Sequence, residues 1–106
     1  MPKILDIDPQ TVKEWLDQGL AVLIDVREHY ELAQYTIPGS VHNPMSNFDF
    51  KAVPSDINLK LVFVCAHGVR SKQVGQYLLQ ENRITAAYNL TGGVAAWAQS
   101  GLASEN

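Results

Sequence analysis

The residues from Leu61 to Leu79 constrain the fold of this chain most strongly, because their hydrophobic pattern changes once, at Cys65. The first four of them, LVFV, form a continuous apolar run, which is typical of a strand buried on both faces of a parallel sheet. From Ser71 onward the apolar residues recur at helical spacing on one face. The residues on that face are Val74, Tyr77 and Leu78. The pattern predicts a buried strand, a short loop that begins at the cysteine, and a helix.

The place of Cys65 between a strand and a helix has chemical consequences. The first backbone N–H groups of a helix have no partner within it, and the helix dipole favours an anion at that end. A thiolate is such an anion, and nearby His67 and Arg70 would further lower a cysteine pKa. Gly68 permits a tight turn that points successive N–H groups inward. The loop therefore predicts a nucleophilic sulfur and an anionic substrate.

Other segments predict strands that alternate with helices. Residues 20–24 (LAVLI) form a second continuous apolar run and predict another buried strand. Before it, Asp8 is expected to cap a helix that starts at Pro9 and ends at Gly19. Further strands are expected at residues 4–5, near Val41 and at residues 86–90, and further helices at residues 28–35 and around Val94 and Trp97. Residues 44–59 have no clear period and predict mostly loop, with one helical turn.

This alternation implies right-handed crossovers and a parallel sheet with helices on both faces. We predict one α/β domain over residues 1–106, with a central parallel sheet of about five strands. Trp15, Trp97 and Tyr77 are expected in the core, and residues 91–93 (TGG) are expected to be a plain turn.

Charged residues follow the 20–24 strand at its carboxyl end, the edge where open α/β sheets place their ligand sites. The two residues concerned are Asp25 and Arg27. We expect them to form a structural pair that supports the cysteine loop, rather than to take part in chemistry.

Composition excludes several classes of protein. The net charge is −3 and the eight Lys and Arg residues do not cluster, so no nucleic-acid partner is expected. No apolar run approaches the ~18 residues of a membrane span, and the N-terminus lacks the apolar region of a signal peptide. We therefore expect no membrane partner.

The single cysteine also bears on location and cofactors. It excludes a disulfide within the chain and suits the reducing cytoplasm, where we expect the protein to act. His29, His42 and His67 do not combine with Cys65 at the spacing of a zinc site, so no metal and no other cofactor is expected.

Three blocks of sequence, in this order, resemble the rhodanese family. They are residues 23–40, with LIDVREHYE and IPGS, residues 64–71 (VCAHGVRS) and residues 88–97 (YNLTGGVAAW). One departure is Tyr35-Thr36, which stands where many members have Gly-His.

The resemblance implies a rhodanese-like fold and a sulfurtransferase. Such a protein moves a sulfane sulfur from thiosulfate or a similar anionic donor to a thiophilic acceptor, and Cys65 would carry the sulfur as a persulfide. The loop would bind the donor through Ala66, His67, Gly68, Val69, Arg70 and Ser71. Because the chain has no second cysteine, the acceptor must be external: cyanide, a small thiol or a partner protein.

Other interpretations remain open. A cysteine phosphatase or arsenate reductase uses a similar loop, but carries one residue more between cysteine and arginine than the four that separate Cys65 from Arg70 here. A non-enzymatic sulfur carrier or protein-interaction module would keep Cys65 but show negligible turnover with small donors. A lone cysteine can also be a small buried hydrophobe, Arg70 a solvated charge and His67 an ordinary loop residue.

Overall fold

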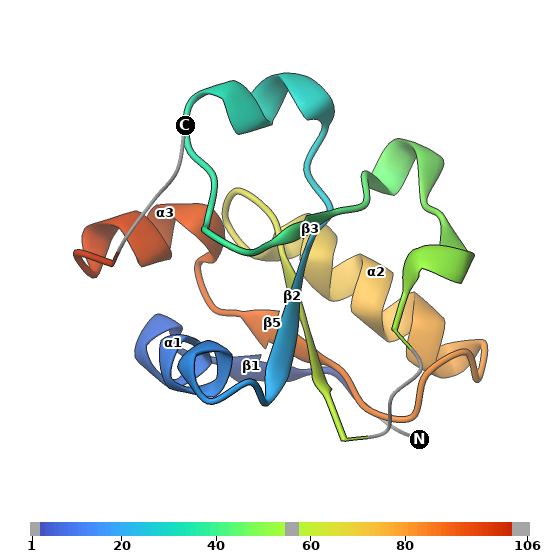
Figure 1. Cartoon of the computed structure of the whole chain (residues 1–106). Helices are drawn as coiled ribbons and strands as arrows, with labels where there is room; N and C mark the ends of the chain where they lie inside the picture. Colours follow the sequence, from blue (N-terminus) through green and yellow to red (C-terminus); the bar gives the residue numbers. More distant parts are fainter. Residues whose placement is uncertain (1–2, 55–57, 103–106) are drawn as a thin grey trace.

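The computed structural model describes residues 3–54 and 58–102, which contain a five-stranded sheet flanked by helices (Figure 1). The strand order is β1-β5-β4-β2-β3, and every pair of neighbours is parallel. The strands are β1 (Leu5–Ile7), β2 (Ala21–Asp25), β3 (Val41–His42), β4 (Lys60–Val64) and β5 (Tyr88–Leu90). The predicted α/β class and parallel sheet are confirmed.

The α-helices are α1 (Pro9–Asp17), α2 (Val69–Gln80) and α3 (Gly93–Gln99), and shorter 3-10 turns are η1 (His29–Ala33), η2 (Met45–Asn47) and η3 (Phe50–Ala52). α1 begins as predicted, because the Asp8 carboxylate accepts a hydrogen bond from the Thr11 N–H at 3.2 Å and Pro9 occupies the first turn. Gly19 follows the helix with φ +71°. Within the described residues, no helix combines the length and the hydrophobicity needed to span a bilayer.

Several boundaries differ from the sequence prediction. β1 lies at residues 5–7 rather than 4–5, because it pairs in register with all of β5. The helix expected at residues 28–35 is only the 3-10 turn η1, none of whose residues is buried; an unburied segment gains too little packing to sustain a longer helix. Residues 44–54 contain two short turns instead of one, and residues 55–57 of the expected loop lie outside the described residues.

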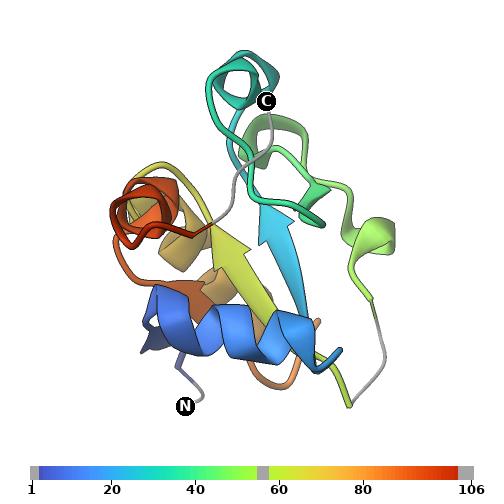
Figure 2. The ribbon, with the colours of Figure 1, turned by 60° about the vertical axis from the view of Figure 1, so that its left-hand side comes forward.

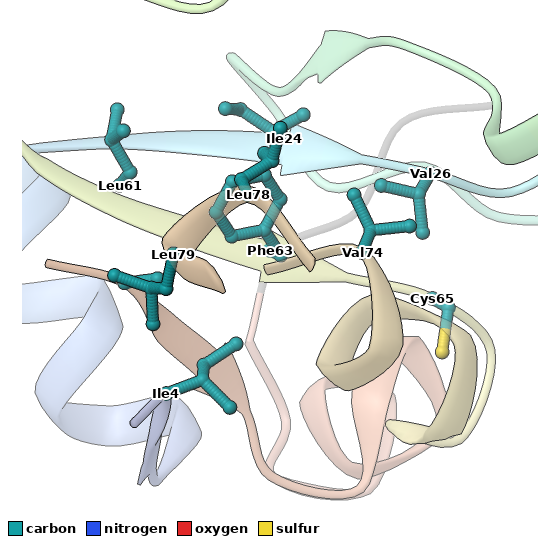
Figure 3. Packing of buried hydrophobic residues seen from close by; sticks show 10 residues of the cluster. Ile4, Ile24, Val26, Leu61, Phe63, Cys65, Val74, Leu78 and Leu79 are labelled. Carbon is teal, nitrogen blue, oxygen red and sulfur yellow. The ribbon is translucent and has the colours of Figure 1, made fainter. Parts of the chain in front are cut away.

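The two faces of the sheet are covered by different helices (Figure 2). Val62 and Val64 of β4 pack with residues of α1 and α3, such as Val12 and Trp97. On the opposite face Phe63 packs with α2. Figure 3 shows this second cluster, in which Phe63, Leu78 and Ile24 lie together and Cys65 lies at its edge. Since successive residues of β4 point to opposite faces, an uninterrupted apolar run is what this central position requires.

The expected core aromatic residues have different outcomes. Trp97 is buried and Trp15 is partly buried against the same cluster, as predicted. The prediction for Tyr77 is wrong, because its side chain is 49% exposed. The buried stripe of α2 passes through Ser71, Val74 and Leu78, which leaves Tyr77 at the border of that stripe.

Candidate active site

Cys65 follows the central strand β4 directly, and its side chain is 1% exposed. Its sulfur points into the turn that leads to α2 (Figure 3). The Gly68 N–H donates a hydrogen bond to Sγ at 3.1 Å, and the Ser71 hydroxyl lies 3.3 Å from Sγ. Gly68 has φ +95°, a left-handed conformation that glycine adopts readily. The predicted strand, tight loop and helix therefore hold the sulfur at the beginning of α2.

The environment of Cys65 lowers the pKa of its thiol. Burial alone would raise the pKa, but hydrogen bonds from the Ser71 hydroxyl and from backbone N–H groups of Ser71, His67 and Gly68 outweigh that cost. Each of these donors stabilises the charged form of the sulfur. The thiolate is thus supported mainly by neutral hydrogen-bond donors of its own loop.

We expect Ser71→Ala to raise the pKa of Cys65, because it removes the hydroxyl, the largest of the contributions that lower it. The rate of alkylation by iodoacetamide, measured against pH, should shift to higher pH. Ser40→Ala is the matched control, since the Ser40 hydroxyl donates to Ile37 O within its own turn, away from the cysteine loop. An unchanged alkylation profile in Ser71→Ala would contradict this account of the thiolate.

Asn89 of β5 is a site residue that the sequence prediction missed. Its Nδ2 donates to Gly68 O and to an Asp6 carboxylate oxygen, each at 3.1 Å. Its Oδ1 accepts from the Ser71 hydroxyl at 2.5 Å, so the single hydroxyl proton is shared between Asn89 and Cys65 Sγ. The Asn89 amide thereby positions both Ser71 and the loop backbone. The sequence did carry a signal for it: Asn89 is a polar residue inside an otherwise apolar predicted strand. A buried polar residue needs hydrogen-bond partners, so its presence there indicates a polar contact.

The Gly92-Gly93 pair is more than the plain turn expected from the sequence. A Cβ atom on Gly93 would lie 2.4 Å from Cys65 O and 2.6 Å from Ala66 O. This close approach lets the first N–H groups of α3 reach the cysteine loop: Val94 N–H donates to Cys65 O at 2.8 Å and Ala95 N–H to Ala66 O at 3.1 Å. The start of α3 therefore fixes the backbone on which the sulfur is carried.

Arg70 lies in the first turn of α2, where an anionic partner was expected. The structure supplies that anion from the protein itself, because both terminal nitrogens of Arg70 donate to the Glu31 carboxylate at 2.8 Å. Hydrogen bonding to Arg70, against the cost of burial, holds the pKa of Glu31 at about 2 and raises that of Arg70. Glu31 was not predicted as a site residue, and no local pattern marks it.

Asp25 and Arg27 form a buried ion pair at 2.8 Å, as the sequence suggested. Arg27 also donates to the carbonyl oxygens of Glu31, at 3.3 Å, and Tyr35, at 2.7 Å. The pair thereby ties the end of β2 to η1, the segment that carries the partner of Arg70. That the pair also supports the cysteine loop stays a prediction.

Two cavities flank the cysteine loop. One, of about 710 Å³, lies beside α2 and includes His67, Gly68 and Val69 in its wall; we call it the α2 cavity. The other, of about 380 Å³, lies beside η1 and includes Glu31, Ala66 and His67; we call it the η1 cavity. His67 and Val69 are exposed side chains at the rim. Within residues 3–54 and 58–102, no three His, Cys, Asp or Glu side chains converge as metal ligands would.

Comparison with known proteins agrees with this geometry. The model of the rhodanese-like domain family matches residues 8–100. YtwF of Bacillus subtilis is 35% identical over 96 residues, which cover 90% of this chain and 91% of that protein. A sulfurtransferase of Allochromatium vinosum is 33% identical over 98 residues, with 92% and 91% covered.

A solved structure is also similar. The crystal structure of a rhodanese-related protein from Thermoplasma volcanium matches with a TM-score of 0.82 and 25% identity, covering 95% of this chain and 97% of that one. The sequence match, the shared fold and the cysteine loop all point to one family. The chain belongs to the rhodanese-like domain family, and its relatives include a protein named as a sulfurtransferase.

Proposed function

We propose that the protein transfers a sulfane sulfur from thiosulfate or a similar anionic donor to a thiophilic acceptor, through a persulfide on Cys65. The observation that carries this proposal is the enclosure of Cys65 Sγ by its loop, where the Gly68 N–H and the Ser71 hydroxyl lie within 3.1 and 3.3 Å. These donors stabilise a negative sulfur. A persulfide formed there would place its terminal sulfur among the N–H groups of the same loop.

The first half-reaction is a displacement at sulfur. The Cys65 thiolate attacks the outer sulfur of the donor, and the bond between that sulfur and the sulfonate sulfur breaks. With thiosulfate, sulfite leaves with the bonding electron pair, and a Cys65 persulfide remains. Ala66, His67, Gly68, Val69, Arg70 and Ser71 would surround the donor during this step.

The second half-reaction discharges the persulfide. Cys65 is the single cysteine of the chain, so an external nucleophile such as cyanide, a small thiol or a partner protein takes the terminal sulfur and restores the thiolate. A thiol that must return to its reduced form in each cycle suits the reducing cytoplasm, and we propose that location for the protein.

The size of the loop favours sulfur over phosphorus chemistry. Four residues separate Cys65 from Arg70, one fewer than in cysteine phosphatases and arsenate reductases. A phosphoryl group needs its non-bridging oxygens seated in the loop while the thiolate attacks in line. A sulfane sulfur is a single atom, which a shorter loop can enclose while the rest of the donor projects outward.

Intact-mass measurement tests this function. Incubation with thiosulfate should raise the mass by one sulfur atom, and a cyanide chase should return it to its original value and release thiocyanate. In parallel, p-nitrophenyl phosphate should not be hydrolysed. Phosphate hydrolysis that depends on Cys65, with no sulfur uptake from thiosulfate, would contradict the proposal.

A sulfur-carrier module loaded only by partner proteins is the alternative. It would show the same loop but negligible thiocyanate formation at any concentration of small donor. Steady-state turnover with thiosulfate and cyanide therefore separates an enzyme from a carrier.

A further inference from the structure

We propose that Glu31 selects against donors with two negative charges, so that the site favours a monoanionic organosulfur donor, a thiosulfonate or an organic persulfide, over dianionic thiosulfate. This inference rests on the proposed function, because it assigns the charge of the donor that the Cys65 thiolate attacks.

The Glu31 carboxylate is held in a fixed place beside the loop. It accepts two hydrogen bonds from Arg70 and a third, at 2.7 Å, from the Glu28 N–H. Arg27 donates to Glu31 O at 3.3 Å and so restrains the backbone of the same residue. Arg70 is therefore not an unpaired cation that waits for a substrate.

Other cations around the loop are balanced in the same way. Arg27 lines the η1 cavity and is paired with Asp25 at 2.8 Å. Lys72 lines the α2 cavity and is paired with Asp6 at 3.2 Å. Among the described residues, each Lys or Arg that lines either cavity has a carboxylate partner. The loop N–H groups suffice for one negative sulfur, but little net positive charge remains for a second negative group.

The rim of the loop also suits a donor that carries an organic group. Tyr30 lines the η1 cavity with its side chain 76% exposed, and Val69 lines the α2 cavity with its side chain 65% exposed. An apolar substituent on the donor that enters either cavity could bury part of one of these surfaces and gain the hydrophobic free energy of doing so. A sulfonate oxygen in the same place would gain nothing from them.

The chemistry of such a donor balances in the same way as that of thiosulfate. The Cys65 thiolate attacks the outer sulfur of methanethiosulfonate, the S–S bond breaks, and methanesulfinate leaves with the electron pair. With an organic persulfide, attack on the outer sulfur releases the corresponding thiol. Methanethiosulfonate is a matched probe for thiosulfate, because a methyl group replaces one charged oxygen.

The test compares these two donors on wild type and Glu31→Gln. The Coulomb energy of a bound donor is proportional to its charge, so removing the Glu31 charge should change the logarithm of kcat/KM twice as much for the dianion as for the monoanion. We expect kcat/KM to rise about threefold with methanethiosulfonate and about tenfold with thiosulfate. Glu31→Ala removes the same charge with a different shape and should give the same two-to-one relation.

Glu28→Gln is the matched charge control. Glu28 precedes η1, and Glu28→Gln removes the same charge. The Glu28 carboxylate accepts hydrogen bonds from Ser46 and from the Glu31 N–H rather than from Arg70, and a glutamine oxygen can accept them as well. We expect this variant to leave the ratio of the two donors' kcat/KM values within about twofold of wild type.

The outcomes separate this inference from the function on which it rests. An equal change with both donors in Glu31→Gln and Glu31→Ala would overturn the selection by charge, because a merely structural role alters both donors alike. A wild-type protein that accepts sulfur from neither donor would instead overturn the proposed function. Sulfur transfer with a two-to-one response would support both.

Discussion

Cys65→Ser should reduce thiosulfate-to-cyanide sulfur transfer by at least about a thousandfold, to the rate without protein. The serine hydroxyl occupies nearly the same volume and still accepts hydrogen bonds from the Gly68 N–H and the Ser71 hydroxyl, which hold the sulfur in the wild type. It lacks a sulfur atom to carry the persulfide, and at neutral pH it is not ionised. Thiocyanate formation measures the loss, and the intact mass should no longer rise with thiosulfate.

The variant is a clean test because its fold should survive. Cys65 is buried at the edge of the core cluster beside α2, and serine removes little volume, so the free energy of unfolding should fall by about 1–2 kcal/mol. Circular dichroism against temperature checks this. If Cys65→Ser formed thiocyanate at the wild-type rate, another group would have to be the nucleophile.

Gly93→Ala should lower the free energy of unfolding by about 2–4 kcal/mol and strongly reduce sulfur transfer. Gly93 has φ +65°, and an added Cβ would lie 2.4 Å from Cys65 O and 2.6 Å from Ala66 C. Both neighbours are backbone atoms of the cysteine loop, which cannot move without displacing the sulfur. The change would also disturb the hydrogen bonds from Val94 and Ala95 to that loop. Chemical denaturation and thiocyanate formation measure the two effects.

Gly39→Ala and Gly101→Ala are the matched controls for Gly93→Ala. Their φ values are +80° and +75°, so they share its backbone strain, but a Cβ at either position would meet no atom within 4 Å. Strain alone should cost each control about 1 kcal/mol and leave sulfur transfer unchanged. Equal destabilisation in all three variants would mean that the contact between Gly93 and the cysteine loop contributes nothing of its own.

Much of the fold could be predicted from the sequence because its signals are local. The apolar runs at residues 20–24 and 61–64 need burial on both faces, and a parallel sheet covered on two sides provides it. The start of α1 at Asp8 and Pro9 is determined by residues that are adjacent in the sequence. Tyr77 fits the apolar spacing of α2 yet is half exposed. Periodicity shows which face of a helix a residue lies near, but it does not show how far the elements packed against that face extend.

The conformation of the cysteine loop could also be predicted from residues that are close together in the sequence. A strand that ends just before Cys65, a glycine that turns the backbone and a helix that begins within the next few residues are all set by adjacent positions, and the structure has them in the expected order. The chemistry expected of the sulfur follows from this short segment. The environment of Arg70 could not be predicted from this segment, because its ion-pair partner, Glu31, lies far away in the chain.

By itself the sequence determined the parallel α/β architecture and the place of Cys65 between a strand and a helix, since hydrophobic period and loop spacing act over a few residues. Only the tertiary structure decided what surrounds that sulfur. Glu31 meets Arg70 across 39 residues of chain, and Asn89 meets Ser71 across 18. The order β1-β5-β4-β2-β3 brings these partners together, and the pairing of distant polar groups leaves no periodic trace, because it depends on which strands become neighbours.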